Sequence, residues 1–155
     1  MDDEGAAERR RLIVLMRRLS AELDQLGHAF AKKHALHPTN VRAIFLIMEA
    51  GLVGAPITPG DLARKLGLTT AAVSSLLDRL EQADHLVRRS VPGDRRRVHL
   101  EVAPEAMKLA ATFFHPLNTR LTRAMEDYSP EEMTAIERFL TDMTREVSGY
   151  REENS

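Results

Sequence analysis

The sequence has no cysteine and no tryptophan, and only 5% of its residues are aromatic. Without cysteine there are no disulfides, no thiolate nucleophiles and no Cys-ligated zinc or iron–sulfur sites. The core must therefore consist mainly of Leu, Ile, Val, Ala and Met. Long hydrophobic runs are also missing, because the apolar segment 12–16 is far shorter than a signal-peptide core or a membrane span. We expect a soluble cytoplasmic protein with no membrane partner.

The charge of the chain is unevenly distributed, although its formal net value is only −1. Residues 58–99 hold eight Lys/Arg against five Asp/Glu, a net charge of +3, whereas residues 100–155 hold six against eleven, a net charge of −5. Five arginines and one aspartate fall within residues 86–97 alone. A local basic patch fits a surface that binds a polyanion, because attraction to phosphates is local. A solvated charged loop would have the same composition, so charge alone leaves both interpretations open.

Two short helices separated by a tight turn are predicted within the stretch "ITPGDLARKLGLTTAAVSSLLDRLEQADHLV". Thr58 is a good N-cap, Pro59 suits the first helical position, and Asp61 follows the cap by three residues. Gly67 ends this helix, and Thr69 caps the next one. This pattern is typical of a helix-turn-helix motif.

The second helix of this pair has a small, polar outer face opposite an apolar stripe. The stripe consists of Val73, Leu76, Leu77 and Leu80. Small hydroxyl and methyl side chains let a helix backbone enter the DNA major groove and touch base edges, phosphates and thymine methyls. A plain amphipathic surface helix is the alternative, but such a helix normally carries more Lys and Glu outward. The candidate DNA-binding residues on this helix are Thr69, Thr70, Ala71, Ser74, Ser75 and Arg79.

A β-hairpin with a cationic tip is predicted directly after the two helices. The segments "HLVRRSV" and "RVHLEV" flank "PGD". Leu86 is expected to point inward in the first, and Val98, Leu100 and Val102 alternate with polar residues in the second. A hairpin in this position makes a winged helix, and arginines at its tip suit the DNA backbone or the minor groove. Asp94 is expected to pair with a neighbouring guanidinium and so to orient another arginine. The candidate DNA-binding residues of the wing are Arg89, Asp94, Arg95, Arg96 and Arg97.

Long amphipathic helices are predicted on both sides of this lobe. The first runs from about residue 8 to 34, and a second begins at Pro38 and is expected to end at a left-handed Gly51. The helix after residue 104 contains Pro116, which should kink it, and Ser129 opens the last helix with a capping box. The apolar stripes of these helices exceed what a small lobe can cover, which favours a homodimer; an intramolecular bundle is the alternative.

The sequence "LTTAAVSSLLDRLEQADHLVRRSVPGDRRRVHLEV" resembles the core of the MarR family of winged-helix regulators. The likeness also covers the long first helix, "DLARKLGL", the Asp94-x-Arg96 pair of the wing and two C-terminal helices. It implies a homodimer that binds an inverted-repeat operator in double-stranded DNA, usually as a repressor relieved by a small-molecule effector. The family's Leu-Thr after the wing is replaced here by Val102-Ala103, which weakens the start of the next helix but leaves the DNA-facing residues intact.

The resemblance predicts a mainly α fold with a small β-hairpin wing in a single domain, 1–155. Its winged helix-turn-helix lobe would comprise residues 37–103, the dimerisation helices residues 8–35 and 104–148, and the flexible ends residues 1–6 and 149–155. The family's effector pocket lies where the dimer helices meet the DNA-binding lobe. The candidate pocket residues are His28, Phe30, His37, Arg42, Phe45, Met107 and Phe114.

Other functions have weaker sequence support. Six histidines suggest a zinc-responsive regulator, but no pair of them has the one-turn spacing of a helical zinc site, and His37 and His115, each before a proline, are interpreted as caps. No phosphate-binding loop or activated nucleophile is evident, so we expect no enzyme activity, no cofactor and no bound metal. A winged-helix protein-interaction module without specific DNA binding remains the alternative, although it would show larger apolar groups on the outer helix face.

Overall fold

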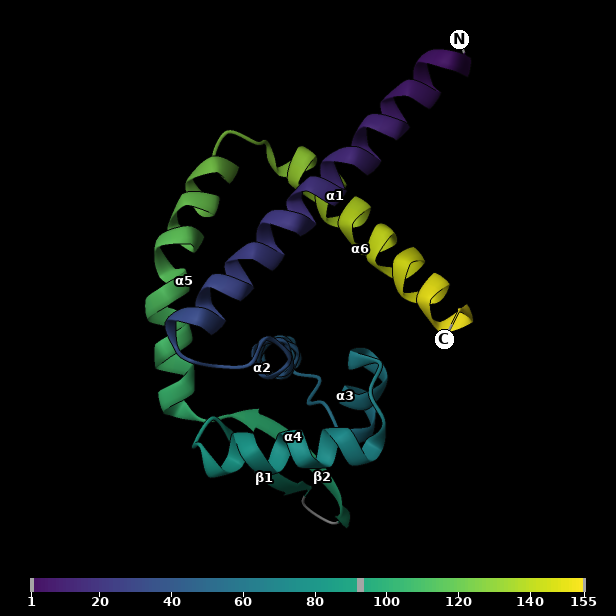
Figure 1. The fold of residues 1–155 in the computed structure, drawn as a ribbon. Helices are drawn as coiled ribbons and strands as arrows, with labels where there is room; N and C mark the ends of the chain where they lie inside the picture. The colour runs from purple at the N-terminus through teal and green to yellow at the C-terminus, as the bar shows by residue number, and fades with distance from the viewer. Residues whose placement is uncertain (1, 92–93, 155) are drawn as a thin grey trace. The chain divides into compact units, whose positions relative to one another are not determined.

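A computed structural model describes residues 2–91 and 94–154, without the side chains of residues 2–3, 91 and 94–97. The chain divides into two compact units, Met1–Pro104 and Glu105–Ser155, which are considered separately below. The first unit contains α1 (Asp2–Lys33), α2 (Pro38–Leu52), α3 (Pro59–Leu66), α4 (Thr70–Gln82), β1 (Leu86–Val91) and β2 (Asp94–Val102) (Figure 1). Next come α5 (Pro104–Met125) and α6 (Pro130–Glu153). The mainly α fold with one antiparallel hairpin is thus confirmed.

The helix-turn-helix has the local structure that the sequence predicts. Thr58 Oγ1 accepts a hydrogen bond from the Asp61 amide at 3.2 Å, and Thr58 Oγ1 donates to Asp61 Oδ2 at 2.6 Å. Gly67 ends α3 in the left-handed conformation, with φ 67°, which glycine adopts without steric cost. Thr69 Oγ1 then accepts from the Ala72 amide at 3.2 Å and starts α4. The two caps and the glycine turn together fix where α4 begins.

The core of the first unit lies beneath α4. The predicted stripe Val73, Leu76, Leu77 and Leu80 is buried, together with Leu62 and Ala63 of α3 and Ile44 and Ile47 of α2. Leu86 and Leu100 close the core from the hairpin, as their alternation predicts. In addition, the Leu100 amide donates to the Ile57 carbonyl at 3.0 Å, which joins the α2–α3 connection to β2.

The end of α2 differs from the sequence-based prediction. Gly51 was expected to end the helix in a left-handed conformation, but α2 continues to Leu52, and Gly54, with φ 68°, is the left-handed residue. The Ala55 amide donates to the Ala50 carbonyl at 2.9 Å, a bond that closes the helix end around Gly54. Of Gly51 and Gly54, only Gly54 directly precedes the Ala55 amide that makes this bond, and Gly54 is the residue with the left-handed conformation.

Both ends of the chain are more helical than expected. Helix α1 already begins at Asp2 and α6 continues to Glu153, so residues 2–6 and 149–153, expected to be flexible, are helical. Acidic residues in a first turn favour a helix because they interact with its positive end. The apolar periodicity that predicted the first helix starts only at Leu12 and therefore missed this turn.

The second unit keeps its predicted cap at Ser129 but not the one at His115. Ser129 Oγ accepts from the Glu132 amide at 3.2 Å, and the Ser129 amide donates to Glu132 Oε2 at 2.8 Å, which completes the capping box of α6. His115 lies inside α5, because the helix continues through Pro116 to Met125. The interpretation of His115 as a cap is therefore wrong: one proline removes a single helical hydrogen bond, and α5 continues beyond it.

Candidate nucleic-acid interface

The outer face of α4 is exposed, and its first two turns carry only small side chains. The six candidates Thr69, Thr70, Ala71, Ser74, Ser75 and Arg79 are all exposed, whereas the apolar stripe is buried. The structure therefore brings the predicted recognition residues together on one surface. Only small hydroxyls and methyls stand between the helix backbone and an approaching groove on its first two turns.

One carboxylate on this face has a cationic partner that the sequence-based prediction missed. Asp78 lies one turn beyond Ser74, and its Oδ1 is 2.6 Å from Nη2 of Arg88 on β1. The Nε of Arg88 also lies 3.6 Å from Glu81 Oε2. Alternation could have located Arg88, because it follows the buried Leu86 by two residues and so points to the same side of the hairpin.

Two neighbouring arginines on β1 of the hairpin lie on opposite faces. Arg88 pairs across the strands with Leu100 and belongs to the core side, whereas Arg89 pairs with His99 and belongs to the outer side. Arg89 Nε lies 3.2 Å from Glu101 Oε2, so this candidate wing residue already has an acidic partner. The side chains of Asp94, Arg95, Arg96 and Arg97 lie outside the described residues, and their proposed roles stay predictions.

The capping box at the start of α3 favours the ionised form of its carboxylate, Asp61. Hydrogen bonding from the Thr58 side chain lowers the pKa of Asp61 below its ordinary value, and the nearby Arg64 guanidinium adds to the effect. The ionised carboxylate suits this position because it lies in the first turn, near the positive end of the helix. Acid would weaken this capping box.

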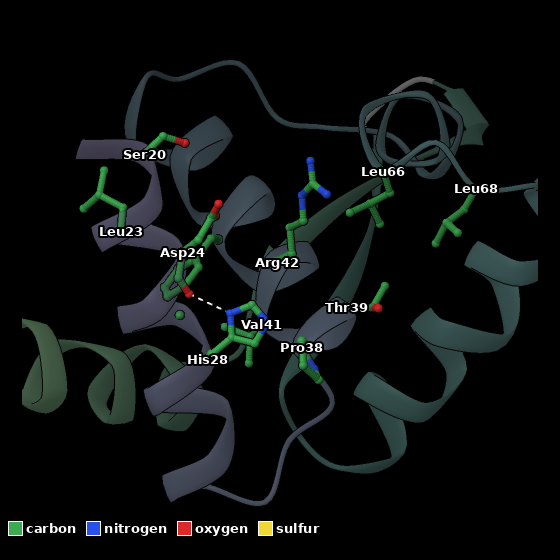
Figure 2. Close-up of a pocket in the computed structure, with 12 residues that line it drawn as sticks. Ser20, Leu23, Asp24, His28, Pro38, Thr39, Val41, Arg42, Leu66 and Leu68 are labelled. Atoms are coloured by element: carbon green, nitrogen blue, oxygen red, sulfur yellow. Dashed lines mark hydrogen bonds between the residues drawn. The ribbon is translucent and has the colours of Figure 1, made fainter. Parts of the chain in front are cut away.

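A cavity of about 610 Å³ lies in the first unit beside α2 (Figure 2). Three of the seven candidate effector residues line it: His28 of α1, and Arg42 and Phe45 of α2. Figure 2 shows Arg42 between the α1 residues on one side and Leu66, the last residue of α3, and Leu68 on the other. The further lining residues, which sequence reasoning missed, are Ser20, Leu23, Asp24, Gly27, Pro38, Thr39, Val41, Leu66 and Leu68.

The remaining candidates for the pocket do not line it. Phe30 is buried, with its ring centroid 6.1 Å from that of Phe45. His37 is the N-cap of α2, where its Nδ1 accepts from the Thr39 amide at 3.2 Å, so its interpretation as a cap is confirmed. Met107 and Phe114 belong to α5 in the second unit.

The described residues hold neither a cluster suited to a metal ion nor a helix suited to a membrane span. Within that part of the chain, no group of three or more His, Asp or Glu side chains is arranged to hold a metal ion. Across the same residues, no helix has both the length and the apolar character to cross a membrane.

Comparisons with known proteins agree with this geometry. The sequence profile of the MarR family matches residues 36–97. The HTH-type transcriptional regulator YcgE of Bacillus subtilis is 33% identical over 128 residues, which is 83% of this chain and 80% of YcgE.

Solved structures share the fold. A mutant of MepR from S. aureus superposes with a TM-score of 0.69 at 20% identity, covering 88% of this chain and 96% of MepR. A second MepR mutant, bound to an oligodeoxyribonucleotide, gives a TM-score of 0.54 at 21% identity over 88% of this chain and 97% of that one. NadR in complex with 4-hydroxyphenylacetate gives 0.61 at 24% identity over 84% and 89%.

Proposed function

The chain belongs to the MarR family of transcriptional regulators, and we propose that it acts as a homodimeric repressor of an inverted-repeat operator, relieved by a small-molecule effector. The observation that carries the DNA-binding part is the exposed face of α4, on which Thr70, Ala71, Ser74 and Ser75 are small and solvent-accessible. A helix with such a face can sink into the major groove and reach base edges with its N-terminal residues. The wing arginines, from Arg95 to Arg97, would add contacts to phosphates or the minor groove.

The proposal of a homodimer rests on apolar side chains that a single chain leaves exposed. On α1, Leu12, Leu19 and Leu23 expose 44%, 55% and 50% of their surface, and α5 and α6 expose Leu121 and Leu140 to a similar degree. Burying such side chains against a second copy is favourable by about 25 cal/mol per Å² of apolar surface. Two-fold symmetry would then place two α4 helices about one DNA turn apart, roughly 34–36 Å, which requires an inverted repeat.

The proposed effector site is the cavity beside α2. Leu66 and Leu68, which line it, lie on either side of the turn that leads into α4, and Leu68 directly precedes the cap Thr69. A molecule held against Arg42, His28 and Phe45 would therefore contact the turn that fixes the start of the recognition helix. Through this contact, a bound effector would shift the start of α4 and so change the affinity of the protein for DNA. NadR, a protein of the same fold, binds 4-hydroxyphenylacetate.

The test begins with duplexes selected by the wild-type protein from a randomised library. We expect the selected duplexes to contain an inverted repeat and to out-compete random duplexes of equal length at fixed salt. Sedimentation should give a dimer. A protein-interaction module or a nonspecific DNA binder would show no preference, and a stable monomer would contradict the symmetric arrangement.

The wing has its own prediction within this proposal. Arg96→Ala should weaken binding to the selected duplex by about 1–3 kcal/mol and flatten its salt dependence, because one phosphate or minor-groove contact is lost. Affinity should be measured at several salt concentrations. An unchanged affinity together with an unchanged salt slope would remove Arg96 from the DNA-binding surface.

A further inference from the structure

We infer that Arg88 is a positioning residue for DNA binding, which holds the hairpin in a fixed relation to the exposed face of α4. The inference rests on the proposed function, because it concerns how the helix and the hairpin reach DNA together. Arg88 Nη2 is 2.6 Å from Asp78 Oδ1, and Arg88 Nε is 3.6 Å from Glu81 Oε2. One guanidinium on β1 thus contacts two carboxylates that lie three residues apart on α4.

The surroundings of Arg88 distinguish this bridge from an ordinary surface ion pair. Its cross-strand partner is the buried Leu100, and Leu86, two residues earlier on the same face, is buried as well. The Arg88 side chain is 34% exposed, whereas those of Arg64, Arg89, Lys108 and Arg145 in their own ion pairs are 64% to 73% exposed. Exposed pairs contribute little because water and salt screen them. The Arg88 guanidinium is shielded more than the cations of the other pairs, while its partners Asp78 and Glu81 are 57% and 45% exposed.

The bridge links the two elements that would contact DNA. Arg88 lies on the strand leading to the wing, and Asp78 lies on the same face of α4 as Ser74, one turn further on. A guanidinium is a planar fork with donors in fixed directions, so contact with two carboxylates restricts both the distance and the angle between strand and helix. With that relation fixed, the helix and the wing can engage neighbouring grooves without a further loss of conformational entropy on binding.

A second consequence of the bridge is electrostatic, and it makes the opposite prediction for one variant. An unpaired carboxylate on the DNA-facing side would repel phosphates, so charge alone predicts that Asp78→Asn tightens binding to every duplex. Positioning predicts that Asp78→Asn weakens binding to the selected operator, because Arg88 loses its shortest contact. The sign of the change therefore separates the two effects.

The experiment measures the affinities of the wild type, Asp78→Asn, Arg88→Met and the double variant. The probes are a duplex selected by the wild type from a randomised library and a random duplex of equal length. We expect Asp78→Asn to bind the selected duplex about five- to twentyfold more weakly and the random duplex no more weakly than the wild type. The double variant should match Arg88→Met within about twofold, because residues that act as one unit show non-additive effects.

Two controls separate positioning from a general loss of stability. Asp142→Asn removes the carboxylate of the 2.7 Å pair with Arg145 on α6. Because α6 is an expected dimerisation helix, sedimentation of this variant is compared with the wild type first; with the same dimer, both affinities should be unchanged. Amide exchange of residues 86–90 in the free protein should be faster in Asp78→Asn than in the wild type or in Asp142→Asn. Arg88→Lys keeps the positive charge but lacks the planar guanidinium. It should recover less than half of the operator affinity that Arg88→Met loses.

Several results would overturn the inference. Tighter binding of Asp78→Asn to both duplexes would leave only the charge effect, and a double variant whose losses multiply would show that Asp78 and Arg88 act separately. Wild-type amide exchange in Asp78→Asn would show that the bridge does not hold the strand. If the wild type itself does not prefer the selected duplex, the proposed function fails; if it does and the variants match it, only the role of Arg88 fails.

Discussion

Replacing Ala71 by glutamate tests whether the small face of α4 meets DNA. Ala71 is exposed in the first turn of the helix, opposite the buried stripe. A carboxylate there would enter the space expected to hold phosphates and base edges. The neighbouring Ala72→Glu is a matched control for charge and helix position, because Ala72 is also exposed but lies on the flank of the helix, on the side of Arg79 and away from Ser74.

The expected magnitude follows from Coulomb's law. Two like charges about 4 Å apart repel by about 1 kcal/mol in bulk water and by about 4 kcal/mol at the effective dielectric constant near a protein surface. Because about 1.4 kcal/mol corresponds to a factor of ten in affinity, this range of repulsion predicts that Ala71→Glu weakens binding to the selected duplex by about fivefold to several hundredfold. Both variants place an acid in the first turn of α4, so the stabilisation of the helix by its dipole, about 0.3–1 kcal/mol, is common to both.

The assay is fluorescence anisotropy with the selected duplex at two salt concentrations, together with thermal unfolding of each variant. We expect Ala71→Glu to lose much more affinity than Ala72→Glu, with the difference shrinking at high salt because salt screens exposed charges. Equal losses in the two variants, or no loss in Ala71→Glu, would refute the assignment of this face to DNA.

Three further predictions concern stability and assembly. Asp61→Asn should lower the free energy of unfolding by about 0.5–1 kcal/mol at neutral pH, as for a weakened cap. Since the pKa of Asp61 is lowered from 3.8, this difference in stability from the wild type should persist above that pH and disappear as the pH falls further. A stability difference independent of pH would contradict the role of the ionised carboxylate. Ala35→Gly should raise stability by roughly 0.5–1 kcal/mol in chemical denaturation, because Ala35 has φ 53°; destabilisation would show that no strain is stored there. Leu19→Glu should shift sedimentation from dimer to monomer with little change in helix content, and an intact dimer would place Leu19 outside the interface.

The boundaries of the helix-turn-helix were predictable from the sequence because they are set locally. Thr58 and Thr69 each accept a hydrogen bond from the backbone amide three residues later, as Ser129 does at the start of α6, and Gly67 supplies a left-handed turn between the first two. The buried stripe of α4 follows in the same way from the helical period. Such features depend on neighbours in the chain, so they need no knowledge of the fold.

Predictions failed where two residues of the same type offered the same local sequence pattern. Gly51 and Gly54 both suit a helix end, and the choice fell to Gly54 because the Ala55 amide reaches the Ala50 carbonyl only in that register. His115 resembled His37 in preceding a proline, yet only His37 lies at a helix start, where Thr39 offers a free amide. Sequence pattern gives the candidates in these cases, and the hydrogen bonds of the folded chain select one of them.

The sequence by itself therefore determined which segments are helices, which sides of them are apolar, and that α4 presents a small polar face before an arginine-rich hairpin. Only the tertiary structure decided that Arg88 reaches Asp78 and Glu81, and that His28, Arg42 and Leu68 line one cavity. Helix caps and apolar periodicity depend on residues only a few positions apart, so they can be predicted from the sequence. A bridge between β1 and α4, or a cavity between α1, α2 and the turn before α4, exists only after the core has packed and brought those elements together.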